Sequence, residues 1–417
     1  MKRVGIALGL ALAGILIFIS NRHAPHASPL RMPAADRTLV VSSEADAGPG
    51  SLRDAILAAD RDPLRSRIVL NVKRIAIESA LPTLINPQGI VIDGAEDGSV
   101  IDASRQAQGS ALQIKSPRSV LRRVKILHAH DRALTVMATG VELESLEVSD
   151  CHTGITLVSG ADGVTIRRSL FERDGTAITG DAPLRNLVIS GSTFRENTKA
   201  GIWFVGSARP AADDTLSRSN SDVNVSDNSF EKNEVGIVLG NRPAVIQKSR
   251  FRNDKASSIL VLSGSATIVD NDVREAVGSA ISVTGGTAVR ISHNMLADNP
   301  DVGIMIRDSG AVIENNTLER NGYGIVAITG KGSPDIVIRD NTLSKTAVDA
   351  ITVIGGSPVL ARNQALGSRS AGVRILDLVQ SGSQIKTTPQ LEANILKGNA
   401  IDSPQTGVYK TADTVQP

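Results

Sequence analysis

The chain contains a single cysteine, Cys151, among its 417 residues. A disulfide scaffold and every cysteine-rich metal module are therefore excluded. Aromatic residues make up only 2% of the chain, whereas glycine occurs 37 times. A core with so few rings must be built mainly from Ile, Leu, Val and Ala, which indicates thin, stacked layers of structure.

The chain also has little net charge. It carries 45 Lys and Arg against 43 Asp and Glu, a formal net charge of +2. Proteins that hold a polyanion through counterion release need a strong basic field, and the overall balance provides none. We therefore do not expect a nucleic-acid partner.

The N-terminus reads as an export signal. Lys2 and Arg3 precede sixteen uncharged, apolar residues, Val4 to Ile19. At about 1.5 Å per residue this segment would span roughly 24 Å, less than the roughly 30 Å hydrocarbon core of a bilayer. We predict a signal peptide over residues 1–27, with an uncleaved signal anchor as the alternative, and a linker over 28–37. The rest of the protein is expected to be exported, in the periplasm or cell envelope.

A small residue followed by an aliphatic residue recurs along the chain, mostly every 21 to 26 residues, with one interval of 35. Each unit also holds short runs of alternating polarity, as in 225–227, 228–230 and 236–239, which predict strands of three to five residues. One such strand cannot bury its inner face unless the next coil stacks on it. A recurrent short polar residue fits a turn and can bond to its equivalents in neighbouring coils: Asn228, Ser249, Asn271, Asn294, Asn316, Asn341 and Asn363. The pattern predicts an all-β fold, a single-stranded right-handed parallel β-helix of about 13 coils over residues 111–410, with a tail over 411–417.

Residues 38–110 are expected to form the N-terminal cap and the first irregular coils. Ser51 and Asp54 resemble a capping box, and an apolar stripe at Leu52, Ala55, Ile56 and Ala59 predicts one amphipathic helix. Such a helix would cover the open end of the stack. The sequence from Asp46 to Ile56, with Leu81–Leu84 and Ile90–Gly94, resembles the pectin-lyase-like β-helix superfamily of exported proteins. The resemblance implies this fold but no single activity.

The residues after the repeated aliphatic positions should point outward from one sheet. Among them only Trp203 is a large, flat side chain, which suits sugar stacking. Thr156 and Thr179 should stand beside it, and the 35-residue coil supplies a loop at 206–220 that could overhang this face. Packing of Trp203 against that loop is the alternative.

Titratable residues gather in the turns before this sheet. His130 lies four residues before its repeated aliphatic, as Cys151 does, and Asp131 and His152 lie three before. With Arg132, Asp150 and Arg173, they should fall within one or two coil spacings of one another.

Two chemical interpretations follow. Lyases and epimerases of uronic-acid polymers remove the proton at C5, which requires a base, an acid and a cation. His130 and His152 would be base and acid, and Arg132 or Arg173 the cation. The segment His130-Asp131-Arg132 also resembles part of the Asp-Pro-His-Asp-Arg motif of mannuronan C5-epimerases, with His128 and Ala129 in place of Asp and Pro.

The second interpretation is a divalent-cation site with His128, His130, His152 and Asp150 as ligands. A third is that these turns are merely solvated.

The sequence thus predicts a protein that engages a polysaccharide. If it is an enzyme, it is a lyase or C5-epimerase of an acidic polysaccharide without an organic cofactor. The catalytic candidates are His130, His152, Asp131, Asp150 and Arg173, and the substrate-binding candidates are Trp203, Thr156, Thr179 and Arg132. The alternative is a non-catalytic envelope protein that uses its long face for binding or as a spacer. The oligomeric state is left open.

Overall fold

The computed structural model describes residues 37–180, 184–206, 222–380 and 383–410. The predicted signal segment, most of the predicted loop at 206–220 and the tail lie outside the described residues. Residues Ala35–Pro417 form one compact unit. Within the described residues, no helix is long and apolar enough to cross a membrane.

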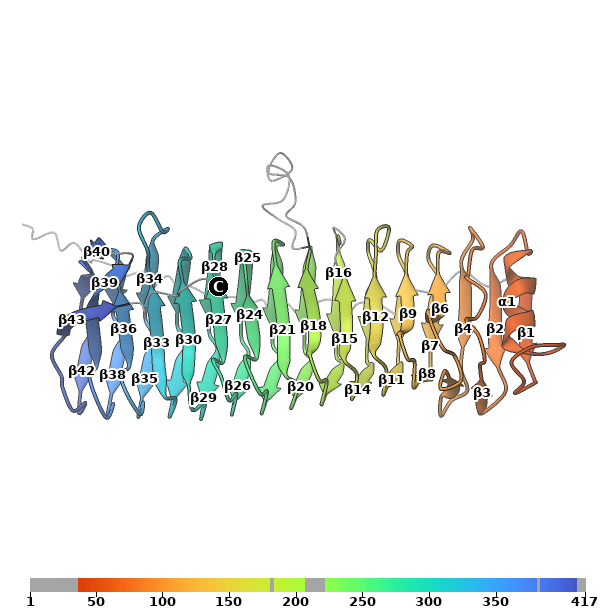
Figure 1. Ribbon diagram of the computed structural model, residues 1–417, viewed down its shortest axis with the longest axis horizontal. Coiled ribbons are helices and arrows are strands. Elements are labelled where there is room, and N and C mark those ends of the chain that lie inside the picture. Colours follow the sequence, from red (N-terminus) through yellow and green to blue (C-terminus); the bar gives the residue numbers. More distant parts are fainter. Residues whose placement is uncertain (1–36, 181–183, 207–221, 381–382, 411–417) are drawn as a thin grey trace, which may run out of the picture. The chain divides into compact units, whose positions relative to one another are not determined.

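The strands of this unit form three sheets, which are parallel apart from one short antiparallel strand near the C-terminal end, and successive coils contribute one strand to each sheet (Figure 1). Sheet A consists of β1 (Arg37–Val41), β2 (Ser66–Leu70), β4 (Ile90–Asp93), β7 (Val120–Arg122), β10 (Glu142–Glu144), β13 (Thr165–Arg167), β16 (Leu187–Ser190), β19 (Val223–Ser226), β22 (Ala244–Gln247), β25 (Gly264–Val269), β28 (Gly286–Ser292), β31 (Ala311–Glu314), β34 (Ile336–Arg339), β37 (Val359–Ala361) and β41 (Gln390–Glu392). Sheet B consists of β3 (Arg74–Ala76), β5 (Ser99–Asp102), β8 (Val124–Leu127), β11 (Glu147–Ser149), β14 (Leu170–Glu172), β17 (Thr193–Arg195), β20 (Ser229–Glu231), β23 (Arg250–Arg252), β26 (Asp272–Arg274), β29 (Met295–Ala297), β32 (Thr317–Glu319), β35 (Thr342–Ser344), β38 (Gln364–Leu366) and β42 (Ile395–Lys397). Sheet C consists of β6 (Ser110–Ile114), β9 (Arg132–Val136), β12 (Thr153–Leu157), β15 (Thr176–Gly180), β18 (Ala200–Val205), β21 (Val235–Gly240), β24 (Ile259–Val261), β27 (Ile281–Thr284), β30 (Val302–Arg307), β33 (Tyr323–Ile328), β36 (Ile351–Ile354), β39 (Val373–Gln380), β40 (Ser383–Ile385) and β43 (Gln405–Lys410).

The three sheets enclose one continuous core of aliphatic residues, since alternate side chains of each strand point inward. Four phenylalanines stack on the inner side of sheet B, one on each of four successive coils. The ring centroids lie 5.0 Å apart from Phe171 to Phe194, and 4.7 Å apart from Phe194 to Phe230 and from Phe230 to Phe251. The predicted parallel β-helix is confirmed, and each repeat of the sequence forms one coil of it.

One helix, α1 (Leu52–Asp60), lies at the N-terminal end of the stack beside β1 and β2 (Figure 1). Its predicted apolar stripe is the buried face, and the Ser51 side chain caps it by accepting a hydrogen bond from the Asp54 backbone N–H at 3.2 Å. Burial of this stripe joins the helix to the core, as the sequence predicted for a cap.

The predicted polar ladder is present in the turn between sheets A and B. Asn316 is typical, because its Oδ1 accepts from both the backbone N–H and the Nδ2 of Asn294 at 2.9 Å, and its own Nδ2 donates to the Ile291 carbonyl. The residue before each ladder member adopts a left-handed conformation, as at Asn315 with φ 55°. Each coil therefore satisfies the turn groups of its neighbour.

Candidate functional site

The residues that follow the repeated aliphatic positions form one row along sheet C, which we call the outward row, and they have the predicted register. Thr156 pairs with Thr135 and Thr179, and Thr179 pairs with Trp203. Trp203 is 39% exposed, and its carbonyl accepts a hydrogen bond from the Thr179 hydroxyl at 3.1 Å. Two threonines and a partly exposed indole thus stand side by side on consecutive coils, and the indole suits a sugar face. The Thr156 hydroxyl is itself buried.

The turn between sheets B and C holds a second polar ladder, which was not recognised in the sequence. Its residues replace one another coil by coil: Cys151, Asp174, Asn197, Asn233 and Asp254. The Cys151 backbone N–H donates to Asp174 Oδ1 at 2.8 Å, and the Cys151 thiol lies 3.4 Å from the Ala129 nitrogen. Cys151 is buried. This burial, and to a smaller extent the charge of Asp174, raises the pKa of the Cys151 thiol to about 12. Its role is that of a ladder residue rather than a nucleophile.

This ladder corrects the predicted alignment of His130. Ala129, not His130, occupies the position of Cys151 and Asp174. The reason is that the turn before β9 is one residue longer than the turns before β12 and β15. His130 is part of this longer turn, so its side chain is exposed instead of entering the ladder.

Two imidazoles of the cluster are oriented by acceptors in the preceding coil. His130 Nε2 lies 3.1 Å from the Ser104 carbonyl oxygen, and His128 Nδ1 lies 3.1 Å from Asp102 Oδ1. Because a carbonyl or carboxylate oxygen only accepts, these nitrogens carry the protons, and the other nitrogen of each neutral ring is left with its lone pair. The His128–Asp102 pair was missed in the sequence, since Asp102 lies at the end of β5, a full coil before.

Asp102 is held ionised. Burial would raise the pKa of its carboxyl, but hydrogen bonds from Arg74, His128 and Ser104 outweigh burial and bring that pKa well below its usual range. An ionised Asp102 accepts the hydrogen bond from His128 Nδ1 and fixes the direction of that ring.

His152 lies in the coil that follows. Its backbone N–H donates to the Ala129 carbonyl at 2.9 Å, and the Thr153 N–H donates to the Asp131 carbonyl at 2.9 Å. The His152 and Arg132 side chains are both exposed, and Arg132 Nη1 lies 3.2 Å from Asp131 Oδ2. The structure therefore brings the backbones of His130, Asp131, Arg132 and His152 together at one edge of sheet C.

Asp150 and Arg173 form a bidentate ion pair across adjacent coils, with both N–O distances 2.8 Å. Arg173 also contacts Glu172 at 2.5 Å. Hydrogen bonds from Arg173 lower the pKa of Asp150, and those to Asp150 raise the pKa of Arg173. The guanidinium of Arg173 is therefore already neutralised by protein carboxylates.

The divalent-cation interpretation gains no support from the geometry. Within the ranges that the structure describes, no three His, Cys, Asp or Glu side chains converge as ligands for a metal ion. What the arrangement offers is acid–base chemistry from exposed imidazoles and the guanidinium of Arg132, which contacts a single carboxylate.

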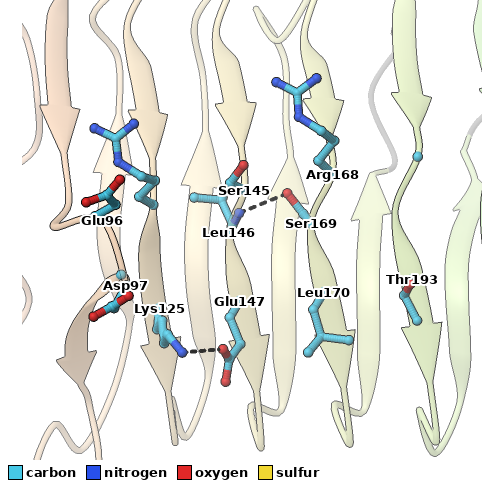
Figure 2. A pocket seen from close by; sticks show the side chains of 13 residues that line it. Glu96, Asp97, Lys125, Ser145, Leu146, Glu147, Arg168, Ser169, Leu170 and Thr193 are labelled. Carbon is cyan, nitrogen blue, oxygen red and sulfur yellow. Dashed lines mark hydrogen bonds and ion pairs between the residues drawn. The ribbon is translucent and has the colours of Figure 1, made fainter.

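A shallow groove of about 350 Å³ lies elsewhere, at the corner between sheets A and B (Figure 2). Lys125 and Glu147 point toward one another in it, with a 2.8 Å ion pair, and Arg168, Glu96 and Asp97 also line it. None of the sequence-predicted site residues lines this groove, and no motif in the sequence marked it.

Three long sheets of short strands, wound around one core, define the class of the protein as a β-solenoid. The chain belongs to the right-handed beta helix region family, which matches residues 69–216, 215–366 and 279–409. The predicted right-handed winding is thereby confirmed. No curated protein matches the chain in sequence.

Solved structures resemble the chain in fold at low sequence identity. The A-module of a mannuronan C-5 epimerase from Azotobacter vinelandii shares 13% identity over 90% of this chain and 98% of its own, with a TM-score of 0.51. The catalytic unit of a GH87 alpha-1,3-glucanase from Streptomyces thermodiastaticus shares 15% identity over 88% of this chain and 69% of its own, with a TM-score of 0.51. At these identities the likeness establishes the fold alone.

Proposed function

We propose that the protein is an exported lyase or C5-epimerase that acts on an acidic polysaccharide. The observation that carries the proposal is the placement of exposed His130, Arg132 and His152 on two adjacent coils, at the edge of the outward row that leads to Trp203. Among the solved structures of similar fold is a mannuronan C-5 epimerase, which supports the choice of substrate class.

In this mechanism His130 is the base. The Ser104 carbonyl holds the proton on its Nε2, which leaves Nδ1 as the atom that accepts the C5 proton of a uronate residue. Arg132 neutralises the uronate carboxylate, which becomes more basic as the C5–H bond breaks. The Asp131 carboxylate orients Arg132 from the adjacent position.

His152 then acts as the acid. In a lyase, it protonates the O4 leaving group as the C4–O4 bond breaks and the C4–C5 double bond forms. In an epimerase, it returns a proton to C5 from the opposite face. Thr156, Thr179 and Trp203 would bind neighbouring sugar residues along sheet C. Asp150 and Arg173 hold one another and support the turn from which His152 projects.

The test is a screen of the purified protein against alginate, polygalacturonate and other polyuronates. The near-ultraviolet absorbance of unsaturated uronates reports a lyase, and proton NMR of the recovered polymer reports epimerisation. His130→Gln and His152→Gln should each reduce turnover at least about a hundredfold. His293→Gln is the matched control, because His293 is an exposed turn histidine outside the cluster and should leave the rate unchanged.

A non-catalytic binding or spacer protein is the second candidate, favoured by the saturation of Arg173 with Asp150 and Glu172. An absence of turnover on every polymer that the wild-type protein binds would favour this alternative. Export itself is tested separately, by cell fractionation and by mass spectrometry of the N-terminus of the protein made in its native host.

A further inference from the structure

The outer face of sheet A carries a cluster of arginines, on β2 and β7 and the residues beside them, around the carboxylate of Asp93 on β4. Three guanidiniums converge on one carboxylate: Arg67 and Arg122 contact Asp93 Oδ2, the latter at 2.7 Å, and Arg123 contacts Asp93 Oδ1. Asp93 is almost completely buried, with a 1% exposed side chain, whereas the side chains of Arg67, Arg122 and Arg123 are 40%, 25% and 37% exposed. The Asp93 carboxylate therefore presents almost no surface to solvent, whereas the guanidiniums do, and exposed Glu96 and Asp97 line one groove with Arg123.

Two more arginines extend this surface. Arg65 donates to the Arg118 carbonyl at 3.0 Å, and Arg118 donates to the Pro87 carbonyl. We call Arg65, Arg67, Arg118, Arg122 and Arg123 the arginine patch. Glu142 lies within electrostatic reach of Arg65 and opposes part of this charge.

The charge of the arginine patch is not balanced by its own contacts. Asp93 provides one negative charge for three guanidiniums, and in the next coil Glu144 is engaged with Arg168. An ion-pair network that served only to hold the fold would be closer to neutral, because desolvated like charges repel one another.

The guanidiniums also retain unused donors. Each has five N–H groups, yet Arg67 and Arg122 each donate a single hydrogen bond, to Asp93. Across the described part of the chain, the Nε atoms of Arg65, Arg67 and Arg122 are buried without a partner. These buried Nε atoms are out of reach of a ligand in solvent, so the donors open to one are the remaining Nη groups, which an anion with several oxygens would satisfy.

The surface between the arginines favours a polar polymer over a lipid bilayer. Val91 and Val120, which lie between the arginine positions on β4 and β7, are only 2% and 4% exposed. These two positions offer no apolar side chain for insertion, and the exposed apolar residues Leu64, next to Arg65, and Val40, on β1, are separate from one another. Membrane-docking surfaces instead combine basic residues with a continuous exposed apolar face. The arginines instead lie on a rigid sheet, whose strands are about 4.8 Å apart.

We propose that the arginine patch is a second binding site, separate from the His130 cluster, for an acidic polysaccharide whose carboxylate or sulfate groups pair with Arg67, Arg122 and Arg123. The two sites share only the class of polymer. The patch lies on the outer face of sheet A, whereas the cluster lies at the turn between sheets B and C. The site would hold a polymer strand on the protein whether or not turnover occurs.

The test is titration of the full-length protein with polygalacturonate, alginate and heparin by calorimetry at low and high salt, with neutral dextran as the blank. The double variant Arg67→Gln/Arg123→Gln leaves Arg122 paired with Asp93, and circular dichroism checks its fold. We expect its affinity for at least one acidic polymer to fall about tenfold or more, with a weaker salt dependence. Arg67→Lys/Arg123→Lys should recover part of the loss, because it restores the charge without the planar fork.

The matched control is Arg320→Gln/Arg362→Gln, which removes two exposed, paired arginines near the other end of the stack and should bind as the wild type. Equal binding by wild type and the patch variant, or no binding of any acidic polymer, would overturn the proposal. So would arginine-dependent binding of phosphatidylglycerol vesicles without polymer binding. Every titration is repeated with His130→Gln, so that loss of turnover and loss of patch binding are scored independently.

Discussion

Asp254 provides a quantitative test of the ladder between sheets B and C. Its carboxyl is completely buried, accepts from the Asn233 backbone and side chain at 3.1 and 3.2 Å, and accepts from the Ser258 hydroxyl at 2.9 Å. Burial raises the pKa of Asp254 to about 7, against an ordinary value of 3.8, although these hydrogen bonds lower it in part. The folded protein therefore favours the protonated carboxyl.

The sign of the pH effect follows directly. Because the folded pKa is raised, the stability that Asp254 contributes is fully present below about pH 3.8 and is lost as the pH rises through about 7. At about 1.4 kcal/mol for each pKa unit, the ionised side chain costs the fold about 4 kcal/mol at higher pH. Asn has nearly the same shape and no charge, and it already occupies this ladder position at Asn233.

We therefore expect Asp254→Asn to increase the free energy of unfolding by up to about 4 kcal/mol near pH 8 and by little near pH 4. Urea denaturation of both proteins across this range measures the difference. Stability curves that run parallel from pH 4 to pH 8 would refute the reasoning, whichever protein is the more stable.

The matched control is Asp340→Asn. Asp340 is an exposed turn carboxylate held by two hydrogen bonds from Arg362, at 2.7 and 2.8 Å, which lower its pKa. Its contribution to stability is lost only in acid, as the pH falls through the lowered pKa. The control curve should therefore follow the wild-type curve between pH 5 and pH 8, where the Asp254→Asn curve diverges.

Three further outcomes are expected. The buried Cys151 thiol, with its raised pKa, should react with iodoacetamide only after the protein is unfolded, and rapid labelling of the native protein would contradict its place in the ladder. Phe230→Ala, which removes a ring stacked between two others, should cost about 3–5 kcal/mol in urea denaturation, and a loss below about 1 kcal/mol would mean that the stack does not support the core. Arg132→Gln should lower kcat/KM on a polyuronate substrate far more than Arg173→Gln, since Arg173 is held by two carboxylates, Asp150 and Glu172, whereas Arg132 contacts only Asp131. Equal losses would refute this division of roles.

The sequence was sufficient to predict the elements that repeat. The register of sheet C, the stripe of α1 and the ladder at Asn294 and Asn316 depend on one residue type or one polarity pattern recurring at nearly constant spacing. Each coil then repeats the evidence, so a local exception such as Ser249 does not obscure the pattern.

The second ladder could not be recognised in this way, because chemically different residues do the same work. Cys151, Asp174 and Asn197 each accept a hydrogen bond from the backbone N–H of the preceding coil's ladder residue, yet they share no residue type. The left-handed position just before each of them was equally hidden, since it is taken by Asp150, Arg173 or Glu196. A residue can join this ladder if its side chain is small and offers one acceptor atom. A pattern of polar and apolar residues along the sequence does not reveal these two properties.

The site depends on turn length, which explains both what was predicted and what was missed. Stacking alone placed His130 and His152 on neighbouring coils, as expected. One additional residue in the turn before β9 then removed His130 from the ladder and left its Nε2 on the Ser104 carbonyl. The contacts in these turns distinguish two kinds of residue. Asp150 and Arg173 use their hydrogen-bonding groups on one another, whereas His128 and His130 each use one ring nitrogen and leave the other free to bind a proton. Groups whose hydrogen-bonding capacity is fully used within the fold support it, and chemistry is expected where one donor or acceptor is left over.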